Sequence, residues 1–144
     1  MLIILKTYYP FPIIDNSNNC FNYSPGANIP QFDIIIPEGS YHVEDINEFI
    51  QLEMEKNCHY DKASDKVNIE ISANTSTLRS QMIVKNNYDV DFRRYKSINS
   101  LLGFHGKLYT WGFNESDNMV NILTINGILV NTDLISGSYA YSST

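Results

Sequence analysis

Short apolar runs, separated by turns rich in Gly, Pro, Asn and Ser, recur along the whole chain. The clearest run lies at 67–72, where Val67, Ile69 and Ile71 alternate with polar residues and predict a half-buried strand. Further strands are predicted at 21–23, 32–36, 78–84, 88–92, 108–113, 120–125 and 128–130, with turns at 115–118 and 126–127. Residues 2–5 are either an opening strand or an apolar arm. Many short strands at about ten-residue spacing are typical of an all-β sandwich or barrel.

One amphipathic helix interrupts this pattern, over residues 44–56. Its apolar positions Ile46, Phe49, Ile50 and Met54 are spaced so that they share one face of the helix. A helix of this length is marginal in water unless its apolar face is covered. We therefore expect Ile46, Phe49 and Ile50 to pack on the strands between residues 67 and 92.

Two turns frame the predicted elements. Pro37 fixes φ and Gly39 can take a positive φ, so we expect residues 37–40 to form a β-turn that leads through Tyr41 into the helix. A single helical turn is predicted at 97–102, with Ser97 as its N-cap and Gly103 as its stop.

Length and charge limit the classes of protein that fit. A chain of 144 residues with 43% hydrophobic residues can bury one core, so we expect a single domain over 1–144, with 1–20 as an extended N-terminal arm. A formal net charge of -6, with Lys and Arg scattered, argues against direct nucleic-acid binding. The small basic cluster of Arg93, Arg94 and Lys96 is more typical of a solvated surface than of a phosphate site.

The cysteines and the N-terminus bear on the compartment. Cys20 and Cys58 are too few for a disulfide scaffold and fit a reducing compartment, although a bridge between them stays open. The N-terminal apolar run is too short for a signal-peptide core or a membrane span. We expect the protein to be made in the cytoplasm, not to be secreted and not to bind a membrane.

No arrangement of residues in the sequence predicts catalysis, a metal or a cofactor. His42, His59 and His105 lie on unrelated segments, and the Cys58–His59 pair alone is a weak zinc signal. The acidic residues Glu44, Asp45 and Glu48 fit a solvated helix face better than an acid-base pair. We therefore expect neither an enzyme nor a small-molecule substrate.

Several blocks of the sequence together resemble one known family. They are FNYSPG at 21–26, FDIIIPEGSYHVEDINEFI at 32–50, ISANTSTLRSQM at 71–82, DFRRYKSINSLLGF at 91–104 and NILTINGILVNTDLISGSY at 121–139. In order and wording they are similar to the penton-like minor capsid proteins of Maverick/Polinton elements and adintovirus-like viruses. The resemblance covers nearly the whole chain from residue 21 onward.

The resemblance implies an antiparallel jelly-roll-like β-sandwich that acts as a virion structural protein. It implies a homo-oligomer, a pentamer if penton-like, that contacts a major capsid protein after synthesis in the host cytoplasm, with the nucleus as a place of assembly. The family continues with further strands after the GSY block, so the resemblance also implies a sandwich without its C-terminal strands. The candidate structural and assembly residues are Pro37, Gly39, Tyr41, Ile46, Phe49, Ile50, Leu101, Leu102, Gly103, Phe104, Gly137 and Tyr139.

Three other interpretations stay open from the residues alone. The first is a carbohydrate- or receptor-binding β-sandwich module, in which Tyr8, Tyr9, Phe11, Tyr88, Tyr95, Tyr109 and Trp111 supply stacking surfaces. In a β protein such aromatic residues are more often core or cross-strand partners. The second is a small enzyme on a cupin-like barrel, which would need three histidines that converge. The third is a decaying genomic copy without a function.

Overall fold

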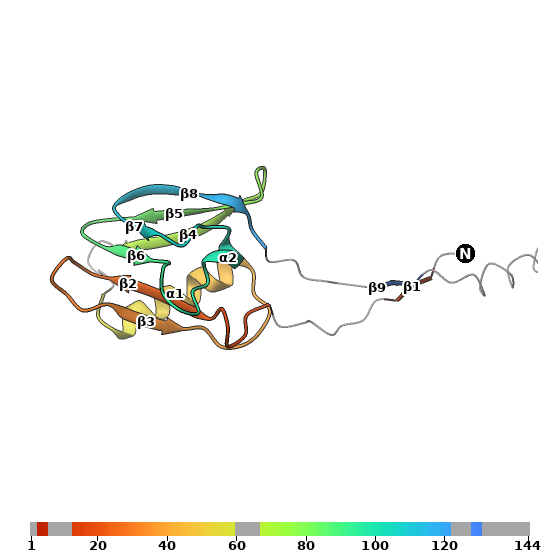
Figure 1. The fold of residues 1–144 in the computed structure, drawn as a ribbon, viewed down its shortest axis with the longest axis horizontal. Helices are drawn as coiled ribbons and strands as arrows, with labels where there is room; N and C mark the ends of the chain where they lie inside the picture. Colours follow the sequence, from red (N-terminus) through yellow and green to blue (C-terminus); the bar gives the residue numbers. More distant parts are fainter. Residues whose placement is uncertain (1–2, 6–12, 60–66, 122–127, 131–144) are drawn as a thin grey trace, which may run out of the picture. The chain divides into compact units, whose positions relative to one another are not determined.

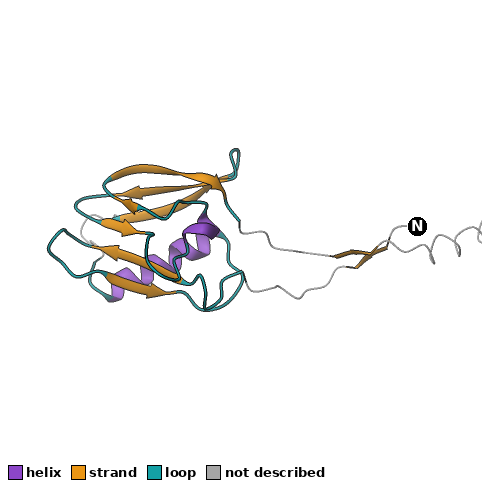
Figure 2. Ribbon diagram, viewed as in Figure 1, coloured by secondary structure: helices purple, strands orange, loops and turns teal. Residues whose placement is uncertain are grey.

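Two antiparallel sheets form the body of the protein. The computed structural model describes residues 3–5, 13–59, 67–121 and 128–130 (Figure 1). A four-stranded sheet has the order β3-β2-β6-β7, and a three-stranded sheet has the order β4-β5-β8. The strands are β2 (Cys20–Ser24), β3 (Phe32–Ile35), β4 (Ile69–Asn74), β5 (Arg79–Val84), β6 (Asp89–Asp91), β7 (Leu108–Tyr109) and β8 (Gly112–Met119). The helices are α1 (Val43–Lys56) and α2 (Asn99–Leu102) (Figure 2).

Both sheets contribute side chains to one apolar core, which confirms the predicted all-β sandwich. Phe21 and Tyr23 enter it from β2, and Ile69 and Ile71 enter it from β4. Around Phe92, the rings of Phe104 and Tyr109 lie with centroids 5.5 Å away, in tilted and edge-on arrangements that favour aromatic contacts. The alternation of apolar and polar residues therefore identified the inward faces correctly.

A separate unit contains the two remaining strands. β1 (Ile3–Leu5) and β9 (Ile128–Val130) pair antiparallel, with Ile4 opposite Leu129. The strand predicted at 128–130 is thus confirmed, and its partner is β1. Of the strand predicted at 120–125, only Val120 and Asn121 lie within the described residues, and neither is in a strand.

The helix α1 covers one edge of the three-stranded sheet. Ile46 and Ile50 are fully buried, and Phe49 is half-buried against the core, as predicted. The side-chain oxygen of Asn47 accepts the backbone N–H of Ile71 in β4 at 2.8 Å. Because β4 ends the sheet, this bond satisfies a backbone donor that would otherwise face water or another chain. At the start of the helix, the carboxylate of Asp45 accepts the backbone N–H of His42 at 2.8 Å.

The N-terminal arm expected over 1–20 does not extend that far into the chain. Ile14 is buried in the core, and its backbone N–H donates to the carbonyl of Gly39 at 3.0 Å. Cys20 already belongs to β2. Residues 13–20 therefore belong to the body, where the sandwich buries Ile14.

The strand expected at 108–113 is instead divided between the two sheets. β7 pairs with β6, whereas β8 begins at Gly112, where φ is +126°, and pairs with β5. The turn predicted at 115–118 is wrong, since those residues continue β8. Their polar side chains are typical of a turn, but Glu115 pairs with Gln81 along a strand that faces solvent on one side.

A glycine ties α2 to the end of β8. Gly103 ends α2 with φ +82°, as predicted, although α2 starts at Asn99 and its N-cap is Ile98 rather than Ser97. The carbonyl of Gly103 accepts the N–H of Asn118 at 2.9 Å. A Cβ at Gly103 would lie 2.2 Å from the Asn118 carbonyl oxygen, so only glycine fits without a backbone shift.

An ion pair holds the segment that follows β6. The guanidinium of Arg93 donates to the carboxylate of Asp91 through Nε at 2.8 Å and through Nη2 at 3.0 Å. Asp91 is buried, and these bonds lower its pKa to about 2. Gln31, which precedes β3, also reaches Asp91. Through this bond to Gln31, Asp91 links the end of β6 to the start of β3.

We predict that Gly103→Ala lowers the free energy of unfolding by about 2 to 4 kcal/mol, because left-handed backbone strain and a backbone clash act together. Chemical denaturation measures the loss. Gly26→Ala is the control, since a Cβ there meets only the side chain of Ile29 at 3.4 Å. Equal stabilities of the two variants would show that the Gly103 contact is not needed.

We also predict that the protein loses stability between about pH 4 and pH 2 through Asp91. The folded pKa of Asp91 is below its unfolded value, so its contribution is present above about pH 4 and is lost as pH falls through the folded pKa. Allowing for the exposure of Arg93, this contribution is about 1 to 2 kcal/mol. Urea unfolding across this range should show a shallower pH dependence for Asp91→Asn. An identical slope in both proteins would contradict the assignment.

Candidate assembly surface

Most of the candidate assembly residues that the structure describes are buried in the body. The buried members are Ile46, Ile50, Leu101, Leu102, Gly103 and Phe104. Side chains without solvent exposure cannot contact another chain, so these residues support the core. Gly137 and Tyr139 lie outside the described residues.

The turn at 37–41 is held by backbone contacts rather than by a special dihedral angle. The freedom of Gly39 to take a positive φ is not used, because Gly39 is not among the residues with positive φ. A Cβ at Gly39 would instead lie 3.1 Å from the ring of Tyr41, which packs against the core. Gly39 also exchanges two hydrogen bonds with Ile14, each 3.0 Å long. The turn thus joins the N-terminal segment to the start of α1, while Pro37 is exposed.

The exposed edge of the three-stranded sheet lies along β8. The two ends of β8 differ. The end of β8 and the residues that follow it bond to the segment around α2, since the Asn118 N–H donates to the carbonyl of Gly103 and the Asn121 N–H donates to that of Leu101. Within the described residues, no strand pairs with the outer side of Gly112–Ser116. An edge of this kind presents backbone donors and acceptors to another chain.

Two large aromatic side chains lie at this open end of β8. Trp111 is 75% exposed and Phe113 is 61% exposed. They sit where the chain crosses from β7 in one sheet to β8 in the other. Trp and Phe supply much of the contact area at protein interfaces, so their exposure beside an open edge makes this region a candidate docking surface. We name Trp111, Phe113 and the edge Gly112–Ser116 the β8 surface.

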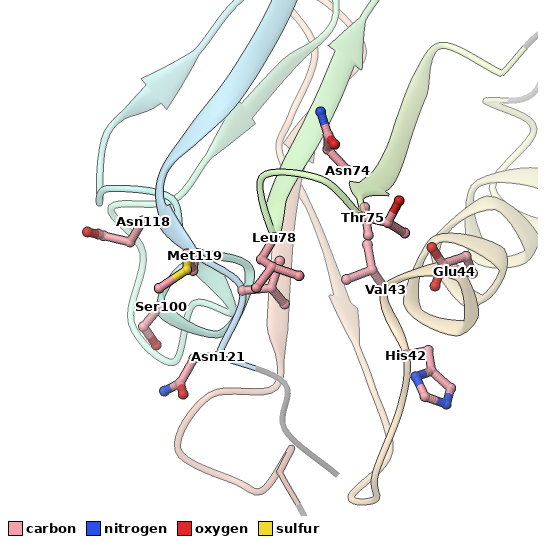
Figure 3. Close-up of a pocket in the computed structure, with 12 residues that line it drawn as sticks. His42, Val43, Glu44, Asn74, Thr75, Leu78, Ser100, Asn118, Met119 and Asn121 are labelled. Atoms are coloured by element: carbon pink, nitrogen blue, oxygen red, sulfur yellow. The ribbon is translucent and has the colours of Figure 1, made fainter.

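A pocket of about 720 Å³ lies at the opposite end of β8 (Figure 3). Its walls come from the start of α1, the turn between β4 and β5, and the residues that follow β8. Val43, Leu78 and Met119 supply apolar surface, and Asn74, Asn118 and Asn121 supply amides. His42 and Glu44 also line the pocket, so it combines apolar surface with amides, an imidazole and a carboxylate.

The histidines and carboxylates are dispersed in the structure. His59 bonds through Nδ1 to the hydroxyl of Tyr23 at 2.7 Å, and His105 lies 3.9 Å from Asp117. In the part of the chain that the structure describes, no three His, Cys, Asp or Glu side chains group as metal ligands. Glu44, Asp45 and Glu48 are exposed on α1.

The aromatic residues considered for sugar stacking divide into two groups. Tyr109 is buried, and Tyr88 is half-buried with its hydroxyl donating to the carbonyl of His59 at 3.1 Å. Burial raises the pKa of both phenols. Tyr95 and Trp111 are exposed, whereas Tyr8, Tyr9 and Phe11 lie outside the described residues.

The cysteines are both free, with Cys20 buried and Cys58 exposed. The bridge left open from the sequence is therefore not formed.

Among the described helices, none is long and apolar enough to cross a membrane.

From the sequence, Trp111 is a candidate for sugar stacking only and Phe113 is not singled out, because both fall in an apolar run that is typical of a core strand. The exposure of their side chains depends on which strand pairs with β8, and that pairing is not visible in the pattern.

No protein-family model, curated protein or solved structure matches the chain.

Proposed function

We propose that this protein is a virion structural protein, a penton-like minor capsid subunit that acts through self-assembly and through contacts with a major capsid protein. The observation that carries the proposal is the β8 surface, where an open strand edge lies beside Trp111 and Phe113. The resemblance of the sequence blocks to penton-like proteins is the reason for proposing that the assembly is a viral capsid. The sandwich itself is compatible with many functions.

The β8 surface suits a protein partner for two physical reasons. A strand added beside Gly112–Ser116 would satisfy backbone groups that the described sheet leaves at its edge. Trp111 and Phe113 would then bury apolar area at low entropic cost, because their rings have few rotatable bonds. Backbone pairing would supply orientation, and the two rings would supply most of the binding free energy.

A carbohydrate-binding module is the second candidate, favoured by the exposed rings of Tyr95 and Trp111. Sugar sites place such rings at a cavity that carries polar groups. Neither ring lines the pocket at the end of β8. A glycan array tests this alternative directly. If the protein binds a glycan and Trp111→Ala abolishes that binding, the carbohydrate-binding function is favoured over assembly.

We predict that Trp111→Ala and Phe113→Ala weaken self-association, or binding to the major capsid protein of the same element, by about 30-fold or more each. Interface residues of this kind contribute about 2 kcal/mol or more. Sedimentation velocity over a concentration series, with cryo-electron microscopy of the assembled species, provides the measurement. Ile29→Ala is the control, because Ile29 is exposed but lies outside β8.

The proposed function fails if the full chain is a strict monomer at high concentration and has no affinity for that major capsid protein. Assembly that is equally strong in the Trp111, Phe113 and Ile29 variants would instead remove the β8 surface as its cause.

A further inference from the structure

A second exposed element lies on the four-stranded sheet and has a distinct chemistry. Arg93, Arg94, Tyr95 and Lys96 follow β6 in one exposed loop, which we name the basic loop. Tyr95 at its centre is 86% exposed. Three of the ten Lys and Arg residues of a chain with net charge -6 are gathered here.

The basic loop is held in place rather than free to move. Its backbone is fastened to the start of β2, since the Cys20 N–H donates to the Lys96 carbonyl at 2.8 Å. Arg93 is bound to Asp91, and the guanidinium of Arg94 donates through Nε to the side chain of Gln31 at 2.9 Å. Because Gln31 is neutral, that bond orients Arg94 without cancelling its charge. A preorganised charged loop loses little entropy when it binds.

A groove of opposite charge lies between α1 and β4. Glu44, Asp45, Glu48 and Glu70 line it, together with Asn47 and Gln51. Leu52, on the adjoining part of α1, is 56% exposed and offers an apolar contact beside the carboxylates. We name this the acidic groove. Within the described residues, its lining contains no Lys or Arg.

We propose that the basic loop of one copy docks into the acidic groove of a second copy, with Arg94 and Lys96 facing the carboxylates and Tyr95 facing Leu52. This inference rests on the proposed assembly function and names the contact between subunits. The charges of the two surfaces are complementary, which steers encounter and fixes register. In the described part of one copy, the hydrogen bonds of the loop go to Cys20, Gln31 and Asp91, so the loop does not occupy its own groove.

The geometry of such a contact determines the kind of assembly. Loop and groove are different surfaces, so the contact is heterologous and each copy has one donor surface and one acceptor surface. Contacts of this type close into rings or extend as filaments, whereas a contact between identical surfaces stops at a dimer. A ring is the form that a penton-like role requires.

Paired charge reversals test the contact. The loop variant carries Arg94→Glu and Lys96→Glu, and the groove variant carries Glu48→Lys and Glu70→Lys, positions that do not cap α1. Each variant alone should associate at least about tenfold more weakly than the unchanged protein, because like charges then meet. An equimolar mixture should recover association between unlike variants, since the reversed loop of one meets the reversed groove of the other. The readout is this association and not closure of a pentameric ring, because an odd number of alternating copies leaves one contact between like variants. Both variants keep a net negative charge, so non-specific attraction cannot explain the recovery.

Sedimentation velocity of the full chain at low and high salt provides the measurement, with circular dichroism to verify folding. The control variant carries Arg79→Glu and Lys107→Glu, an exposed Arg and Lys outside the basic loop, and should associate like the unchanged protein. The proposal is supported if the mixed variants associate at low salt and if high salt abolishes that association.

Two results would overturn it. Rings that form equally well in both reversed variants would remove the loop–groove contact while leaving the capsid function in place. A failure of the folded variants to associate when mixed would also overturn it. Binding of the basic loop to nucleic acid, measured with a short single-stranded DNA and lost in the loop variant, would assign the loop to a different partner.

Discussion

The need to satisfy the edges of two small sheets determines much of this structure. Every strand edge carries backbone groups that must bond to protein or to water. At β4 the requirement is met by Asn47, whose amide oxygen accepts the Ile71 N–H from a helix that also covers the core. At the far end of β8 it is met by the backbone of Gly103. In the three-stranded sheet, the described residues leave Gly112–Ser116 of β8 as the open stretch of edge.

The parts of the fold that were predictable from the sequence are those in which one local pattern decides the outcome. The spacing of Ile46, Phe49 and Ile50 identified α1 and its buried face, and the alternation at 69–71 identified the inward face of β4. The left-handed stop at Gly103 followed from the same kind of local preference. In each case propensity and burial point to the same structure.

The errors occur where tertiary pairing overrides local preference. Residues 115–118 are polar and typical of a turn, yet β8 continues through them, with Glu115 and Met119 paired to β5 on either side of a register irregularity. The sequence allows Gly39 a left-handed conformation, which it does not adopt, and its lack of a side chain instead makes room for Tyr41. The candidate site was hidden for a related reason: Tyr109 is buried and Trp111 is exposed, although the two residues lie in the same apolar run. Which of them faces solvent depends on the crossing between sheets.

The bond between Gly103 and Asn118 also sets a length scale. Because the end of β8 is already occupied, the free edge consists only of Gly112–Ser116. At about 3.3 Å per residue, a strand laid beside it can run for about 17 Å before it meets the α2 segment. A longer partner strand would have to bend away or stop there, so the fold limits the length of any strand that pairs with this edge.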